Sequence, residues 1–348
     1  MLLASRSSTD GGAACATVAA GSTISPVRMV LVRNDKLGDS LMTTPLVATL
    51  HREIPNLHLT AVTDTMGREV FSRLSQVSDL RLMPAFPTLR EALREGIAWR
   101  RSRVHTVIMS RPNGRVYAIA ALLSGAKRRI GAANPSKWYA KLLTANRWSD
   151  FDSREHFARK FLSLGEPILG YRLADEPTIF PHRKVAMEPA AAILHMGGGG
   201  AHLMLSEEKY LQLAHGLKDA FGTVTLTGDY AVSEMAARIA SVTGARDLVG
   251  ETDLDALASL QGKARVTVGV TTGAMHIAAA VGCPQAVGIL MRSTDPLQWS
   301  PWMAPYELVR PQRFCEICTD TLCTRTESTC METLQANEVV SAAVRVAR

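Results

Sequence analysis

The sequence lacks the features that would place the protein in a membrane or outside the cell. Across its 348 residues, no apolar run reaches the roughly 18–20 residues that a membrane-spanning helix needs. Residues 1–25 are rich in Ala, Ser, Gly and Thr, but Asp10 interrupts them and their apolar portion is too weak for a signal peptide. We therefore expect a disordered leader over residues 1–25 and a cytoplasmic protein.

Two common nucleotide-binding motifs are absent as well. The glycine run at 197–200 is followed by His202, so it does not spell G-x-G-x-x-G, and it lacks the Gly-Lys-Ser/Thr of a Walker A sequence. A nicotinamide dehydrogenase and a P-loop enzyme therefore lose support. Glycines still let backbone amides approach a phosphate closely, which makes Gly197, Gly198 and Gly199 candidate ligand contacts. A turn without any ligand is the alternative.

Cysteine is scarce, and its six copies do not form the pattern of a disulfide scaffold. Four of them are bunched near the end, at Cys315, Cys318, Cys323 and Cys330. Close thiols in a cytoplasmic protein are more typical of structural zinc or iron than of disulfides. The spacing lacks the paired Cys-x-x-Cys units of a strong zinc motif, so four reduced thiols are an equal alternative. Four protein ligands would leave no open position, and we assign no catalytic role here.

The charge balance is basic, with a formal net charge of +7. This predicts attraction to something anionic, such as a nucleic acid, a membrane face or a phosphorylated substrate. Arginine and lysine crowd the region 81–147. A solvated face explains any single one of them, whereas together they suit an anionic acceptor or a lipid surface. No aromatic ribonucleoprotein signature is present, so we do not expect nucleic acid as a partner.

Strand-like and helix-like stretches alternate along the whole chain, which predicts an α/β fold with parallel sheets covered on both faces. The early strands are expected at 27–32, 57–63, 80–83 and 104–109. The length suggests two domains rather than one. We predict a first domain at 26–165, a linker at 166–190, a second domain at 191–335 and a closing helix at 336–348.

The first strand leads into the stretch Arg33-x-Asp35-x-Leu37-Gly38-Asp39. Ligands of open α/β sheets bind outside the carboxyl ends of the strands, so Asp39 is a titratable group where substrates bind. Asp39 could instead cap a helix that starts at Ser40. Pro45, however, would suit the first position of a helix capped by Thr44, which would leave Asp39 in the loop. The two roles can also coexist.

The second half carries a similar arrangement. A predicted buried strand at 265–270 is followed by a loop of small residues and a short helix, in the order Thr271, Thr272, Gly273, Ala274, with His276 in the first helical turn. Small residues let a diphosphate rest on a helix N-terminus, which His276 could also reach. A lone histidine is, however, more often structural.

Asp229 follows another predicted strand, at 223–227, and Glu234 lies in the helix after it. An acid just past a strand in a nucleotide-binding half often meets ribose hydroxyls. The alternative is that Asp229 only begins the turn after this strand.

Three motifs together resemble glycosyltransferase family 9, the heptosyltransferases of the lipopolysaccharide inner core. The first is the Asp39 stretch followed by Thr43-Thr44-Pro45; the others are Thr272-Gly273-x-x-His276-x-Ala278-Ala279-Ala280-x-Gly282-x-Pro284 and Thr294-Asp295-Pro296-x-x-Trp299-x-Pro301. Each motif is weak alone, but their order and separations are specific. The resemblance spans nearly the whole chain and implies the GT-B architecture, in which two Rossmann-like, doubly wound domains face a cleft.

The resemblance also implies an activity, which is inverting transfer of a sugar from a nucleotide diphosphate sugar, typically ADP-heptose, to a core-sugar hydroxyl. Asp39 would be the catalytic base, and no metal would be needed, because helix N-terminal amides stabilise a departing diphosphate. The donor contacts would be Thr271, Thr272, Gly273, Ala274 and His276, with Gly197, Gly198, Gly199, Asp229 and Glu234. The candidate acceptor contacts are Asp35, Lys36 and Arg111. The expected acceptor is an anionic glycan or glycolipid, with peripheral contact at the cytoplasmic face of the inner membrane.

The chain departs from the family pattern at two positions. Many members have an aspartate at the position of Thr271, and many have a lysine at the position of Leu203. Either the donor differs from the usual heptose or another cation, Arg292 or Lys36, compensates. Two other functions therefore stay open: transfer to a protein or small-molecule natural product, and a catalytically silent binding or scaffold protein on the same fold.

Overall fold

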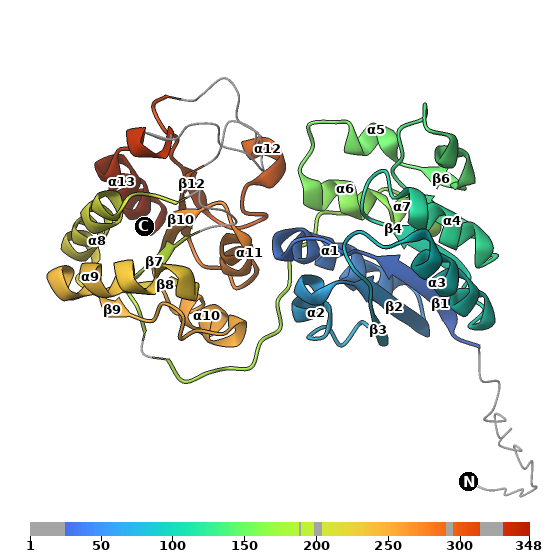
Figure 1. The fold of residues 1–348 in the computed structure, drawn as a ribbon, viewed down its shortest axis with the longest axis horizontal. Helices are drawn as coiled ribbons and strands as arrows, with labels where there is room; N and C mark the ends of the chain where they lie inside the picture. The colour runs from blue at the N-terminus through green and yellow to red at the C-terminus, as the bar shows by residue number, and fades with distance from the viewer. Residues whose placement is uncertain (1–24, 188, 198–203, 290–294, 314–329) are drawn as a thin grey trace, which may run out of the picture.

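The computed structural model describes residues 25–187, 189–197, 204–289, 295–313 and 330–348. Each half of the chain forms one parallel sheet of six strands, and the two halves lie side by side (Figure 1). The strand orders are β3-β2-β1-β4-β5-β6 and β12-β11-β10-β7-β8-β9. Both orders reverse beside the first strand of the sheet, at β1/β4 and at β7/β10, as in doubly wound nucleotide-binding folds. The predicted α/β fold with two such sheets is confirmed.

Four strands of the first sheet match those expected from the sequence: β1 (Val27–Val32), β2 (Leu57–Thr63), β3 (Asp79–Leu82) and β4 (Thr106–Met109). Two short strands, β5 (Arg128–Gly131) and β6 (Ala145–Asn146), complete the sheet and were not predicted. Alternate residues of β1 serve opposite faces: Met29 and Leu31 belong to one apolar cluster, and Val30 and Val32 to another. Both faces are therefore buried, as a parallel sheet requires.

Helices cover both faces of this sheet. They are α1 (Leu37–Glu53), α2 (Thr65–Phe71), α3 (Leu89–Arg101), α4 (Arg115–Leu123), α5 (Trp148–Phe151), α6 (Phe157–Ser163) and α7 (Glu166–Leu169), with a 3₁₀ turn at Trp138–Leu142. Helices α1 and α6 pack on the Leu31 face, and α3 and α4 on the Val30 face. Between Gly170 and the next strand, the described residues form neither helix nor strand.

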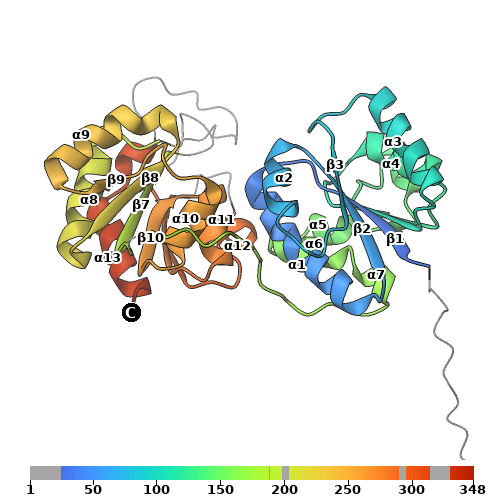
Figure 2. The ribbon, with the colours of Figure 1, turned by 90° about the horizontal axis from the view of Figure 1, so that it is seen from below.

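The second sheet repeats this plan. Its strands are β7 (Ala192–Met196), β8 (Val224–Gly228), β9 (Arg246–Asp247), β10 (Val266–Val270), β11 (Gln285–Ile289) and β12 (Tyr306–Leu308). Its helices are α8 (Glu207–Phe221), α9 (Ser233–Thr243), α10 (Leu254–Gln261), α11 (Gly273–Ala280), α12 (Pro296–Trp299) and α13 (Ala336–Val346), with 3₁₀ turns at Tyr230–Val232 and Cys330–Thr333. Helices α8, α9 and α13 cover one face of the sheet, and α10 and α11 lie toward the first half (Figures 1 and 2).

Helix α1 begins earlier than expected. Neither a start at Pro45 nor an N-cap at Asp39 is correct, because the helix runs from Leu37 and places Asp39 in its first turn and Pro45 in its interior. Proline has no N–H for the carbonyl four residues back, here that of Leu41. The Thr44 hydroxyl donates to that carbonyl at 2.7 Å. The neighbouring side chain thus replaces the missing backbone donor and lets the helix continue.

The same hydroxyl connects the helix to the following chain. Thr44 Oγ1 accepts a hydrogen bond from the Ile179 backbone N at 2.9 Å. Ile179 lies in the extended segment that links the two halves. The Thr-Thr-Pro motif therefore fixes the path of this connection against α1.

The third sequence motif crosses back from the second half to the first. Trp299 of α12 stacks against Phe157 with ring centroids 4.1 Å apart. The Gln298 side-chain amide donates to the Ser153 carbonyl at 2.9 Å, and Trp302 Nε1 donates to the Glu176 carbonyl at 2.7 Å. Asp295 caps α12 through the Leu297 amide and also pairs with Arg154. Residues 295–302 therefore join the two halves.

Candidate active site

The Asp39 carboxyl lies at the carboxyl edge of the first sheet and is buried. Its Oδ1 atom forms an ion pair with the guanidinium of Arg33, the first residue after β1. Burial raises the pKa of Asp39 above its ordinary value, and the positive charge of Arg33 offsets part of that rise. A carboxyl whose pKa is raised toward neutrality is better matched to general base work than an ordinary surface acid.

Arg33 is a site residue that the sequence interpretation missed. Its side chain is only 2% exposed, and Nη1 donates to the Ser110 carbonyl at 3.0 Å. The guanidinium carbon also stands 4.6 Å from the Phe161 ring centroid. A buried charge is costly unless it is paired, and here Asp39 supplies the partner. The available signal was an arginine placed directly after a buried strand, six positions before the acid.

The structure brings the three candidate acceptor residues to the same edge. The Asp35 carboxylate accepts a hydrogen bond from the Lys36 backbone N at 2.9 Å and lies 3.9 Å from Arg111 Nε. Asp35 also lies 3.8 Å from the Arg33 guanidinium. Lys36 is exposed and precedes α1 as its N-cap. Against the raising effect of burial, the charges of Arg33 and Lys36 lower the pKa of Asp39, and the neighbouring Asp35 carboxylate raises it.

The first turn of α11 faces this edge, and α1 and α11 lie next to each other in both views (Figures 1 and 2). A Cβ atom on Gly38 would come within 2.6 Å of His276 Cδ2, and one on Gly273 within 2.8 Å of Leu37 Cδ2. No side chain fits at either glycine without a shift. The Gly-Asp and Thr-Gly pairs therefore allow the two helix N-termini to approach closely.

The α11 side of the site carries no formal charge between Thr271 and His276. Thr272 is the N-cap without a side-chain capping bond, and its buried hydroxyl has no hydrogen-bond partner among the residues described. Burial lowers the pKa of His276 to about 4, so its imidazole is neutral at neutral pH. Amides of a helix N-terminus with a free hydroxyl beside them form an anion-binding arrangement.

The other donor candidates lie at the neighbouring strand ends. Gly197 has φ +84°, which favours glycine, and its N–H donates to the Tyr210 hydroxyl at 2.9 Å. Asp229 accepts from the Ala231 N at 2.9 Å, so it does start the turn after β8. Glu234 is exposed in the first turn of α9. Gly198, Gly199 and Leu203 lie outside the described residues.

The predicted metal site cannot be assembled from the described residues. Cys315, Cys318 and Cys323 lie outside them, and Cys330 begins the 3₁₀ turn that precedes α13. Within the described part of the chain, no group of His, Cys, Asp and Glu has the arrangement of a metal site. The metal therefore stays a prediction.

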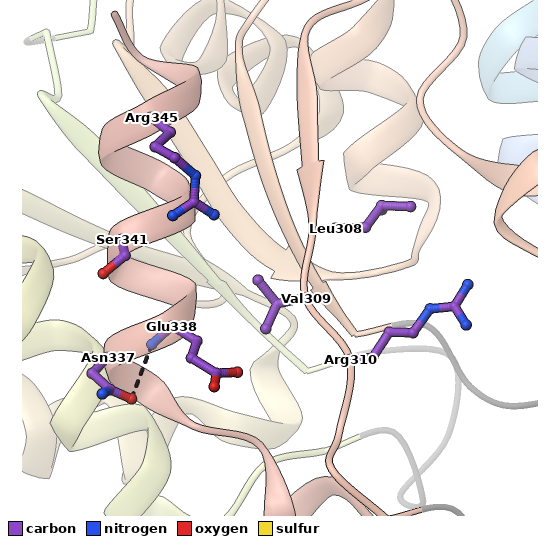
Figure 3. A pocket seen from close by; sticks show the side chains of 7 residues that line it. All are labelled: Leu308, Val309, Arg310, Asn337, Glu338, Ser341 and Arg345. Carbon is purple, nitrogen blue, oxygen red and sulfur yellow. Dashed lines mark hydrogen bonds between the residues drawn. The ribbon is translucent and has the colours of Figure 1, made fainter.

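A separate hollow of about 540 Å³ lies between the β12 strand end and α13. Arg310, Glu338 and Arg345 are among its lining side chains (Figure 3). Arg345 is engaged with Glu307 at 3.1 Å. None of the candidate donor, acceptor or catalytic residues lines this hollow.

A family model for glycosyltransferase family 9 (heptosyltransferase) matches residues 116–328. The match covers more than half of the 348-residue chain. The chain therefore belongs to glycosyltransferase family 9, as its motifs indicated. The matched range includes the Thr272–Gly273 motif and excludes Asp39.

Solved structures show the same fold. A family 9 glycosyltransferase of Veillonella parvula has a TM-score of 0.72 and 14% identity, with 92% of this chain and 97% of that chain covered. The E. coli heptosyltransferase WaaC, solved with ADP, has a TM-score of 0.67 and 17% identity, with 90% and 98% covered. The iron-containing dodecameric glycosyltransferase TibC of enterotoxigenic E. coli has a TM-score of 0.54 and 14% identity, with 92% and 76% covered.

A search of curated protein sequences finds no significant match to this chain. In the part of the chain that the structure describes, no helix is both long enough and apolar enough to cross a bilayer.

Proposed function

We propose that this glycosyltransferase moves a heptose from ADP-heptose to a hydroxyl of an anionic glycan or glycolipid such as lipopolysaccharide core. The observation that carries the proposal is the position of Asp39, a buried acid in the first turn of α1, opposite the uncharged N-terminus of α11. One helix end offers a proton acceptor and the other an anion site. Transfer between two bound substrates needs both.

In the proposed reaction, the acceptor oxygen attacks the anomeric carbon as the bond from that carbon to the diphosphate breaks. The hydroxyl proton passes to the Asp39 carboxylate, and ADP leaves with the bonding electron pair. Attack from the face opposite the leaving group inverts the anomeric centre. The Arg33 guanidinium favours the ionised, proton-accepting form of Asp39 in a buried position.

The departing diphosphate gains negative charge, which the α11 end is suited to stabilise. Backbone amides of Gly273 and Ala274 and the hydroxyl of Thr272 provide donors there, with the helix dipole adding a partial positive charge. The neutral His276 imidazole lies against Gly38, between the two helices. Our proposal for this leaving group needs no metal ion. Thr271 replaces the common acid, so the sugar hydroxyls would need another partner.

The WaaC structure was solved with ADP and another with an ADP-heptose analogue, which supports an ADP-sugar donor for this fold. For the acceptor, the supporting feature is positive charge at the edge of the first sheet, from Lys36 and Arg111. We infer that the protein works at the cytoplasmic face of the inner membrane, where such an acceptor would be found.

The test is a panel of nucleotide sugars measured by thermal shift and by ADP release with a lipopolysaccharide-core acceptor. We expect stabilisation by ADP-heptose and ADP, because a ligand that binds only the folded state raises its melting temperature. Release of ADP should need the acceptor. No response to any nucleotide would support a silent scaffold instead.

A further inference from the structure

The outer surface of α3 carries an unusual combination of side chains. The buried residues Ala92, Gly96 and Trp99 define the side that faces the sheet. Residues at 90, 94, 97 and 101 share the opposite side, because helical neighbours recur every three or four positions. They are Arg90, Arg94, Ile97 and Arg101, and all are exposed.

In the described part of the chain, the acidic residues of α3 form no ion pair with this row of arginines, although hydrogen bonds from Thr88 and the charge of Arg94 both lower the pKa of Glu91. Glu91 accepts hydrogen bonds from the backbone N and the hydroxyl of Thr88, as part of a capping box. Glu95 pairs with Arg81 of β3 at 2.7 Å. Among the described residues, Arg90, Arg94 and Arg101 form no ion pair. Three arginines therefore point a concentrated positive charge at solvent.

Helix α4 lies beside α3 (Figures 1 and 2) and also carries an exposed apolar side chain on the side toward α3. The two helices approach closely at Gly96, where a Cβ would come within 2.6 Å of the Ala120 carbonyl oxygen. Ile97 of α3 is 48% exposed, and Leu123 of α4, one helical turn from Ala120, is 37% exposed. Outer helices of a water-soluble α/β fold usually turn polar residues outward.

We propose that this arginine–leucine face, formed by Arg90, Arg94, Ile97 and Arg101 of α3 with Leu123 of α4, docks on an anionic lipid bilayer. Unpaired arginines complement anionic headgroups, and leucine and isoleucine side chains enter the acyl boundary. A protein partner would need carboxylates opposite the arginines and an apolar surface of complementary shape. A fluid bilayer needs only the charge and short apolar side chains that the face provides.

The face adjoins the acceptor side of the candidate site. Phe86, which is 81% exposed and precedes α3, lies under the Arg111 guanidinium with a carbon-to-centroid distance of 4.5 Å. Arg111 in turn approaches Asp35. A protein docked in this way would hold the acceptor edge of its first sheet close to the lipid headgroups. The docking itself does not depend on the proposed function. Only the reason why docking would be useful rests on that function.

The test is co-sedimentation of the full chain, without donor or acceptor, with vesicles of phosphatidylcholine alone and with equal parts of phosphatidylglycerol and phosphatidylcholine. We expect binding to the anionic vesicles only, weakening as salt is added. The variant R90Q/R94Q/R101Q should bind the anionic vesicles on the order of a hundredfold more weakly, because each cation near the surface contributes about tenfold or less in affinity. The variant I97S/L123S should bind more weakly while keeping the salt dependence of the unmodified protein.

The matched control K263Q/R265Q/R313Q removes three exposed cations of the second half that form no ion pair with the described residues, and it should bind like the unmodified protein. Equal loss in this control, or equal binding to both kinds of vesicle, would overturn the proposal. A dimer in analytical ultracentrifugation that I97S/L123S abolishes would also overturn it, because a second copy would then cover the face. R90Q/R94Q/R101Q should still release ADP at the normal rate from an acceptor that carries no lipid. This measurement distinguishes a loss of membrane docking from a failure of the proposed function.

Discussion

The carboxyl edges of the two sheets differ sharply in charge although their strand orders match. At the first edge, Arg33, Asp35, Asp39 and Arg111 form a partly buried ionic cluster. At the second, the segment from Thr271 to His276, which includes the first turn of α11, carries no formal charge and ends in a neutral imidazole. Under the proposed function, the same topology would serve proton transfer at one edge and anion binding by backbone amides at the other.

The difference in charge fits the two tasks that the proposed function gives to the two edges. A base has to hold a proton in one state and lose it in another, which needs a charge whose pKa is set by burial and a partner. A diphosphate already carries its charge, so donors fixed in a helix end serve it without a counter-ion. Variants that add or remove charge should therefore damage the two edges in different ways.

The largest effect is expected from D39N, which keeps the shape of the side chain and removes the base. Loss of general base catalysis typically lowers the rate by about 10²–10⁴-fold. Affinity for ADP, measured by titration calorimetry, should change little because α11 lies on the other side of the site. The control D219N alters an exposed acid of α8. Unchanged turnover of D39N would show that Asp39 is not the general base.

Next in size is R33M, which leaves the Asp39 carboxyl buried without its partner. Breaking a buried ion pair costs about 3–5 kcal/mol of folding stability, measurable by urea unfolding. Arg33 lowers the pKa of Asp39 against the raising effect of burial, so its loss should raise that pKa further. The rate rises with pH as Asp39 ionises, so the acid limb of kcat/KM should move to higher pH. An unmoved acid limb would contradict this coupling.

A smaller effect is expected from G38A and G273A, which test the contact between the two edges. Each added Cβ meets the opposite helix at less than 3 Å, and overpacking of this kind costs about 1–3 kcal/mol. We expect weaker ADP binding and slower turnover, because the helix ends must separate. The control G114A adds a methyl with only ordinary contacts, the nearest at 3.5 Å. Full activity in G38A and G273A would show that the helices need not touch.

The smallest effect concerns Thr44, which supports α1 around Pro45. The variant T44V leaves the Leu41 carbonyl and the Ile179 amide without their partner, at a cost of about 1–3 kcal/mol. The matched control is T49V on the same helix, because the buried Thr49 hydroxyl has no hydrogen-bond partner among the described residues. We expect T49V to be neutral in thermal unfolding. Equal destabilisation by both variants would remove the special role of Thr44.

The sequence by itself determined the two parallel sheets, the family and most strand positions. Periodicity and alternation are local signals, and a buried strand such as Val266–Val270 reads as an apolar run in any context. It also placed Asp39 and Thr272 at strand ends. The error at α1 was local as well, because proline rules that hold on average did not anticipate a threonine hydroxyl bonding to the Leu41 carbonyl.

Only the tertiary structure decided which groups meet. Arg33 and Asp39 are joined because β1 and the first turn of α1 bring them together in a space closed by Ser110 and Phe161. The contact of Gly38 with His276 links residues more than half the chain apart, and no pattern in either segment specifies it. Spacing along the chain reports local geometry, whereas burial and pairing depend on what packs from elsewhere. For that reason the acid was visible in the sequence, and its partner and environment were not.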